Sequence, residues 1–146
     1  MNVQDCKDFM EKEDCKCVVA DEEKIIFTSN KKGIVPMLDM LKLYEEGRIR
    51  PVYQADRILG KAAILIAAHC GMKEIYSDVV SQSAMDIGQR KKIAVSYKTL
   101  VPQILNPLKQ KEGPFEAALK DVDEEDFPKV LSIIQETLEK IRAQKV

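Results

Sequence analysis

The sequence has no apolar run close to the roughly 20 residues that a bilayer-spanning helix needs. Its first six residues also lack the charged and apolar regions of a secretory signal. Concentrated basic charge is missing too: 23 Lys and Arg stand against 24 Asp and Glu, and the densest basic cluster is only Arg90–Lys92. Double-stranded nucleic acid requires a larger positive patch than this. We therefore expect a cytoplasmic protein with no membrane and no double-stranded nucleic-acid partner, although a single nucleotide remains a plausible ligand.

Residues that hold metals are scarce as well. The chain has one histidine, His69, and four cysteines, Cys6, Cys15, Cys17 and Cys70. The Cys-x-Cys spacing is a weak zinc signal compared with paired Cys-x-x-Cys knuckles. Without a secretion signal, a chain of this size is expected to keep its thiols reduced. We predict no metal site, no cofactor and no disulfide.

The apolar pattern indicates a single domain over residues 1–146, because one core suffices for a chain of this length. The predicted strands are 17–20, 24–28, 51–55, 73–80 and 93–97, and the predicted helices between and after them are 34–44, 61–70, 81–87 and 115–121. A short polar turn joins the first two strands and predicts a hairpin. This order predicts an α/β fold: a three-layer α/β/α sandwich with a mixed sheet of about five strands, whose antiparallel part comes from the hairpin.

Both ends of the chain add helices to this fold. Residues 3–14 alternate charged and small apolar groups, which predicts an N-terminal helix. A C-terminal helix is predicted over 124–144, where acidic residues at its start favour the positive end of the helix dipole. Its apolar stripe is Val130, Ile134, Leu138 and Ile141.

Several short segments, in this order and spacing, carry a family resemblance. They are Ile25–Ser29, Lys32–Ile34, Ala55–Ala63 and Val95–Pro102. In these segments the chain resembles the family called domain of unknown function 1893, over roughly residues 16 to 120. The resemblance implies the fold of the cytidine deaminase-like superfamily.

The chemistry of zinc-dependent deaminases is not expected to come with that fold. Such enzymes carry His-x-Glu or Cys-x-Glu at one helix start and Pro-Cys-x-x-Cys at the next, where the ligands hold zinc and the glutamate moves a proton. The corresponding starts in this chain, Gly60–Ala62 and Ser81–Met85, offer no thiolate, imidazole or glutamate. His69 and Cys70 lie roughly 13 to 15 Å from the start of their helix, at 1.5 Å per residue. Zinc-dependent deamination is therefore not expected, and we assign no catalytic residue.

The segment from Asp56 to Lys61 is the first candidate binding site. The strand predicted at 51–55 breaks at Asp56, and the next helix opens at Gly60 and Lys61. Such a strand-to-helix turn is where α/β folds expose backbone amides to anions. Lys61 puts a cation where the helix dipole disfavours it, so a bound anion would relieve the cost. The alternative is that Asp56 caps the turn and Lys61 extends into water.

Three further residues complete the candidate site. Ser81 could donate to the same anion or serve only as a helix cap. Asn106 and Glu116 flank a Pro- and Gly-containing loop and could close over the crevice, or they could be ordinary turn and first-turn residues. Members of the resembled family carry Asn-Arg and Cys-Pro-Met-Glu at this loop, whereas this chain lacks the arginine and the cysteine. Thiol chemistry is therefore not expected there.

These residues support a deaminase-fold protein without the zinc and catalytic motifs, which binds a small anionic ligand or nucleotide through Asp56, Gly60, Lys61, Ser81, Asn106 and Glu116. The alternative is a non-enzymatic homo-oligomeric interaction module that uses the stripe of the C-terminal helix. A third hypothesis, a zinc-independent enzyme with Asp56 and Lys61 as an acid/base pair, has no spacing that identifies a substrate.

Overall fold

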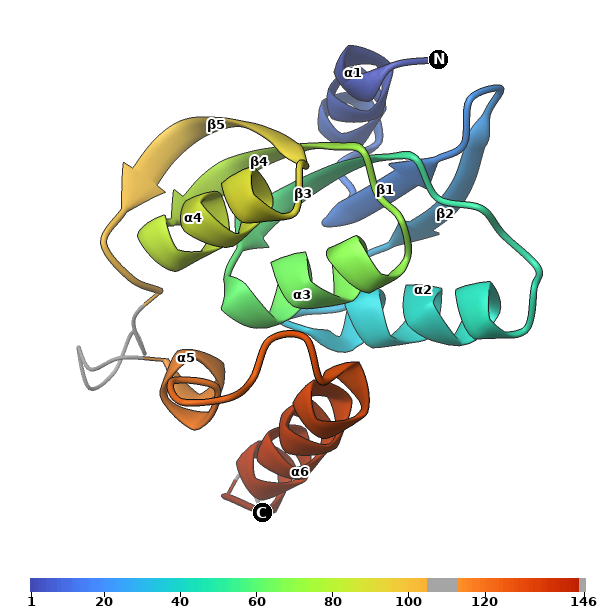
Figure 1. Ribbon diagram of the computed structural model, residues 1–146. Helices are drawn as coiled ribbons and strands as arrows, with labels where there is room; N and C mark the ends of the chain where they lie inside the picture. The colour runs from blue at the N-terminus through green and yellow to red at the C-terminus, as the bar shows by residue number, and fades with distance from the viewer. Residues whose placement is uncertain (105–112, 145–146) are drawn as a thin grey trace.

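The computed structural model describes residues 1–104 and 113–144, which form five strands and six helices (Figure 1). The strands are β1 (Cys17–Ala20), β2 (Ile25–Ser29), β3 (Tyr53–Leu59), β4 (Glu74–Ser81) and β5 (Ala94–Val101). The helices are α1 (Val3–Glu13), α2 (Val35–Glu45), α3 (Lys61–His69), α4 (Gln82–Arg90), α5 (Pro114–Ala118) and α6 (Phe127–Gln144). Each of them corresponds to an element predicted from the sequence.

The strands form one mixed sheet in the order β2-β1-β3-β4-β5. β1 is antiparallel to both β2 and β3, whereas β3, β4 and β5 run parallel to one another. The hairpin therefore supplies the antiparallel part of the sheet. The α/β fold with a mixed five-stranded sheet is confirmed, and the finer assignment to a cytidine deaminase-like three-layer sandwich stays a prediction.

Two apolar clusters hold the helices against the sheet. In the smaller cluster, Cys6 and Met10 of α1 pack with Ala55 of β3. In the larger one, α3 lies among α2, α4, α5 and α6. Residues 61–67 of α3 are all buried, and this central position explains why the helix has no polar face.

Helix α6 completes the larger core. Val130 and Ile134 are fully buried, and Leu138 packs against the same cluster. Next to them the Phe127 ring stacks on His69, with 3.7 Å between ring centroids. The first half of the predicted stripe therefore serves the core of the subunit itself, while a homo-oligomeric partner stays a prediction. Neither α6 nor any other described helix is long and apolar enough to cross a membrane.

The main difference from the predicted elements is how far two strands extend: β5, predicted over 93–97, ends at Val101, and β3, predicted over 51–55, ends at Leu59. The strand does not break at Asp56: it continues to Leu59, and Asp56 pairs with Cys17 on one side and Ser77 on the other. The ladder to β4 continues beyond this point through Ile58. Because this pairing satisfies the backbone, it outweighs the low strand propensity of aspartate.

The burial along α6 predicts unequal costs for truncating two residues of its stripe. Ile134→Ala should lower the free energy of unfolding by about 2 to 5 kcal/mol, because it leaves a cavity in the core. Ile141→Ala, near the partly exposed end, should cost less than about 1 kcal/mol. Urea unfolding of both variants measures the difference. Equal losses would mean that the end of α6 is packed as closely as its middle.

Candidate functional site

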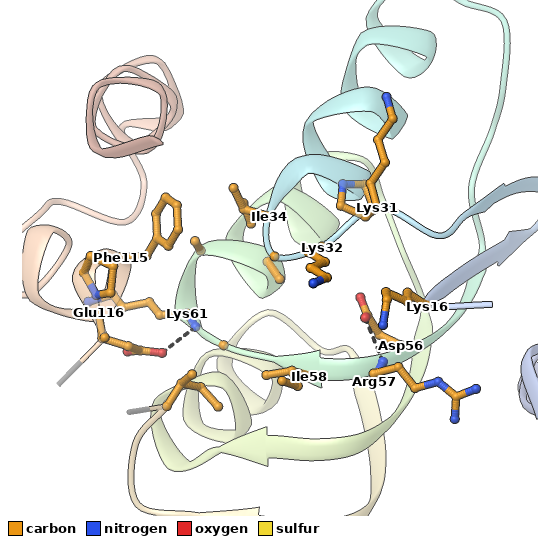
Figure 2. Close-up of a pocket in the computed structure, with 18 residues that line it drawn as sticks. Lys16, Lys31, Lys32, Ile34, Asp56, Arg57, Ile58, Lys61, Phe115 and Glu116 are labelled. Atoms are coloured by element: carbon orange, nitrogen blue, oxygen red, sulfur yellow. Dashed lines mark hydrogen bonds between the residues drawn. The ribbon is translucent and has the colours of Figure 1, made fainter. Parts of the chain in front are cut away.

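A pocket of about 460 Å³ opens at the carboxyl end of β3. Its walls come from the segments before β1 and α2, from the end of β3 and start of α3, and from α5 with the residue before it (Figure 2). The residues that line it are Lys16, Lys31, Lys32, Gly33, Ile34, Pro36, Asp56, Arg57, Ile58, Gly60, Lys61, Ala62, Ala63, Ile104, Gly113, Pro114, Phe115 and Glu116. The pocket therefore lies where parallel strands of α/β folds commonly bind ligands.

The two ends of the pocket differ in chemistry. Figure 2 shows Lys16 and Asp56 at one end and Phe115 at the other, with Lys32 and Ile34 between them. Lys16 and Lys32 are exposed, and neither forms an ion pair with any residue in the described ranges 1–104 and 113–144. The pocket thus combines uncompensated positive charge with an apolar wall.

A third lysine at the charged end is already paired. Lys31 donates to Asp39 of α2 over 3.0 Å, and both side chains are largely exposed. An exposed pair of this kind is weak, so Lys31 can still add to the positive field over the pocket.

Asp56 lies in the middle of β3, with its carboxyl at the charged end of the pocket. Oδ1 accepts a hydrogen bond from the Arg57 backbone N–H at 2.8 Å, and Oδ2 accepts from Gln54 Nε2 at 3.0 Å. Burial raises the pKa of Asp56 to about 7, although these hydrogen bonds and the nearby Arg57 act in the opposite direction. Near neutral pH the carboxyl therefore exists in both its charged and its neutral form.

The Arg57 guanidinium forms no ion pair with Asp56, because its partners lie on the α1 side of the sheet. It donates to Asp78 at 3.0 Å and to the backbone oxygens of Cys15 and Met10. Adjacent residues of a strand point to opposite faces of the sheet. The side chains of Asp56 and Arg57 therefore point apart although the residues are neighbours in sequence.

At the other end of the pocket, Glu116 bridges the starts of two helices. Its Oε1 accepts from the Lys61 backbone N–H at 2.9 Å, and its Oε2 accepts from Ser83 Oγ at 2.9 Å. Ser81 Oγ also reaches Oε1 at 3.4 Å, and it accepts from the Ala84 N–H as the N-cap of α4. Helix starts attract anions through free N–H groups and the helix dipole. Here the anion is a carboxylate of the chain itself.

Gly60 makes this arrangement sterically feasible. It is the N-cap of α3 and has no side chain to cap the helix, so Glu116 supplies the acceptor instead. A Cβ atom at position 60 would lie 3.0 Å from Glu116 Oε1 and 3.4 Å from Ile104 Cγ1. Glycine therefore lets α5 approach the helix start closely.

Lys61 is buried and tied into the structure. Its Nζ donates to the Leu119 carbonyl oxygen at 2.7 Å and lies 3.4 Å from Glu124 Oε2. Glu124 is also paired with Arg90, at 2.6 Å. The alternative in which Lys61 extends into water is therefore wrong. Its charge is compensated by the segment between α5 and α6.

The structure gathers most of the residues predicted as a site. Asp56, Gly60, Lys61 and Glu116 line the pocket, and Ser81 joins them through Glu116 without lining it. Asn106 lies outside the described residues.

The cations and the aromatic wall of the pocket could not be recognised from the sequence. Lys16 lies between two buried cysteines, and Lys32 lies in a polar turn before α2, so each looks like an ordinary surface lysine. Phe115 lies in α5, a helix of five residues, which is too short to give a periodic signal. Only the fold brings these three together.

Possible metal ligands are scattered through the described ranges, and the thiols there are buried. Within residues 1–104 and 113–144, no three His, Cys, Asp or Glu side chains are grouped so that they could hold a metal ion. All four cysteines are free, as predicted, and buried. Burial raises the pKa of Cys6 to about 11 and that of Cys70 to about 12, and it raises the pKa of Cys17 well above its usual value. These groups are poor nucleophiles at neutral pH.

Comparison with known proteins identifies a family and a fold. A sequence model of the family described as "Domain of unknown function (DUF1893)" matches residues 5–138. The structure is similar to the crystal structure, at 2.70 Å resolution, of a DUF1893 family protein from Thermotoga maritima, with a TM-score of 0.75 and 22% sequence identity over 94% of this chain and 88% of that chain. At this identity the similarity shows the fold alone. No curated protein matches the sequence significantly.

The contacts of Glu116 predict that this residue supports stability. Glu116→Ala should lower the free energy of unfolding by about 2 to 4 kcal/mol, because it leaves the Lys61 N–H and the Ser83 hydroxyl without a buried acceptor. Glu116→Gln keeps one acceptor oxygen and should cost less. Glu139→Ala, on the exposed side of α6, is the matched control and should change little. Urea unfolding at pH 7 measures all three, and a Glu116→Ala loss no larger than that of Glu139→Ala would refute the bridging role.

The raised pKa of Asp56 predicts that stability falls as pH rises. Between the unfolded pKa near 4 and the folded pKa of about 7, the unfolded chain releases a proton that the folded chain keeps. The free energy of unfolding should therefore drop by as much as about 4 kcal/mol across this range through this group alone. Asp56→Asn should remove that contribution. Denaturant unfolding at pH 5, 6, 7 and 8 tests it, and parallel curves for both proteins would contradict it.

Proposed function

The chain belongs to the DUF1893 family, and we propose that its pocket binds a small organic anion of the size and amphipathic character of a mononucleotide. The observation that carries this proposal is the pair Lys16 and Lys32, which face one cavity and have no ion-pair partner among the described residues. Two such cations at the mouth of a cavity attract an anion over a distance of about one Debye length.

The shape of the pocket supports an organic ligand rather than a bare ion. Its volume of about 460 Å³ lies within the range of roughly 300 to 1,000 Å³ in which proteins bind small molecules. Ile34, Ile104 and Phe115 offer apolar surface away from the lysines. A planar ring against Phe115 would leave its acidic group on the side of the pocket that holds Lys32 and Lys16.

In this proposal the roles of the residues at the start of α3 differ from those predicted from the sequence. Glu116 already accepts the hydrogen bond of the Lys61 backbone N–H. The Lys61 ammonium is compensated by the Leu119 carbonyl oxygen and the Glu124 carboxylate. Gly60 and Lys61 therefore shape the wall of the pocket, while Lys16 and Lys32 neutralise the ligand. Asp56 contributes a carboxyl that can accept or donate a hydrogen bond, depending on its protonation.

We also propose that the fold is related to that of the cytidine deaminase-like superfamily. The order of elements supports this, with an antiparallel hairpin followed by alternating helices and parallel strands. In this relation, the starts of α3 and α4 correspond to the positions at which a deaminase holds zinc. In this chain those two starts are joined by Glu116.

Binding of mononucleotides provides the test. Nucleoside monophosphates should raise the melting temperature and give a saturable heat in isothermal titration calorimetry, whereas the corresponding uncharged nucleosides should bind at least about tenfold more weakly. The double variant Lys16→Ala/Lys32→Ala should lose at least about tenfold in affinity, and the affinity of the unmodified protein should fall as salt is added.

The matched control is Lys12→Ala/Lys24→Ala, which removes the same charge from exposed positions outside the pocket. It should bind as the unmodified protein does. Equal affinity in the two double variants, or no binding of any mononucleotide, would refute the proposal.

A further inference from the structure

The charged end of the pocket contains an acid as well as its cations. Asp56 is partly buried there, and none of the lysines around the pocket forms an ion pair with it. A bound anion held by Lys16 and Lys32 would therefore lie close to the Asp56 carboxyl. Two negative charges at that distance repel each other strongly in a partly buried site.

We propose that the pocket takes up its organic anion together with one proton, which Asp56 holds. The site then selects anions that can bind beside the neutral carboxyl of Asp56. This inference rests on the proposed function and adds that Asp56 is the group that makes anion binding depend on pH.

The surroundings of Asp56 make it the group that changes charge near neutral pH. From β1 it faces the Cys17 thiol, whose pKa is raised well above its usual value, and from β4 it faces Ser77. The other charged residues that line the same cavity are Lys16, Lys31, Lys32, Arg57, Lys61 and Glu116, and of these Arg57 lowers the pKa of Asp56. Lysine side chains ordinarily titrate well above neutral pH.

Gln54 is suited to hold Asp56 in either state. It is fully buried, its Nε2 donates to Asp56 Oδ2 and to the Met37 sulfur, and its Oε1 has no hydrogen-bond partner among the described residues. Because an amide has a donor and an acceptor of nearly the same shape, the Gln54 side chain turned by 180° would accept from a protonated Asp56. The charge on Asp56 can therefore change without repacking of the core.

The direction of the coupling follows from charge. An anion in the pocket favours the neutral carboxyl, so binding draws a proton from solvent once the free carboxyl has begun to ionise. Below that point affinity is independent of pH. It should fall by about fivefold from pH 7 to pH 8 and by about tenfold for each further pH unit, until the carboxyl ionises in the complex as well.

The probe for this coupling is 8-anilinonaphthalene-1-sulfonate, a fluorescent aromatic anion whose sulfonate stays charged throughout the pH range used. Its affinity is measured by fluorescence titration between pH 5.5 and 8.5 at constant ionic strength. The unmodified protein should lose about fivefold in affinity from pH 7 to pH 8. Asp56→Asn, which keeps the shape but cannot ionise, should bind at every pH as tightly as the unmodified protein does at pH 5.5.

Proton uptake provides a second measurement that needs no variant. Calorimetric titrations of the unmodified protein, in two buffers of different ionisation enthalpy, should give uptake of about half a proton at pH 7 and nearly one at pH 8. No uptake at either pH, or the same pH dependence in Asp56→Asn, would overturn the inference.

The lysine variants separate this inference from the proposed function. Loss of probe binding in Lys16→Ala/Lys32→Ala, but not in Lys12→Ala/Lys24→Ala, places the probe in the pocket. If the probe binds there without taking up a proton, the coupling fails and the anion site stands. If the probe binds at no pH, or binds equally to both double variants, the anion site fails and the coupling fails with it.

Discussion

The carboxylate of Glu116 is the interaction on which the arrangement around the pocket depends. It satisfies the first N–H of α3 and the hydroxyls at the start of α4, so one side chain joins two helices to α5. Phe115, its neighbour, is thereby held as a wall of the pocket. Burying a carboxylate without such partners costs free energy. The Glu116 carboxylate and the contacts among α3, α4 and α5 therefore stabilise one another.

The hydrogen bonds of Glu116 also decide whether the start of α3 can bind an external anion. A free helix start invites an external anion, whereas this one is already neutralised from within. The positive charge left over lies elsewhere, on Lys16 and Lys32, which come from the segments that flank the hairpin. The pocket therefore has an internally balanced end and a positively charged end, and this asymmetry would orient an amphipathic ligand.

The sequence was sufficient to predict the elements of the fold and insufficient to predict the contacts of its charges. Strands and helices follow local periodicity, and even α3, apolar nearly all round, could be recognised as a buried helix. The ends of elements depend on partners distant in sequence: β3 continues past Asp56 because β4 pairs with it. Lys61 could not be assigned its acceptors, since Leu119 and Glu124 lie about sixty residues further along. Lys16 and Lys32 carry no local signal at all, because only the packing of β1 and α2 against β3 gathers them.

Gly60 has a consequence for how the pocket could change over evolution. The space between the start of α3 and Glu116 fits the hydrogen atom of glycine at position 60. A methyl group there would lie too close to Glu116 Oε1. A single substitution there would push α5, with Glu116, outward and widen the cavity while leaving Lys16 and Lys32 in place. The width of the cavity and its charge are thus set by different residues, so ligand size could diverge between relatives while the preference for anions is retained.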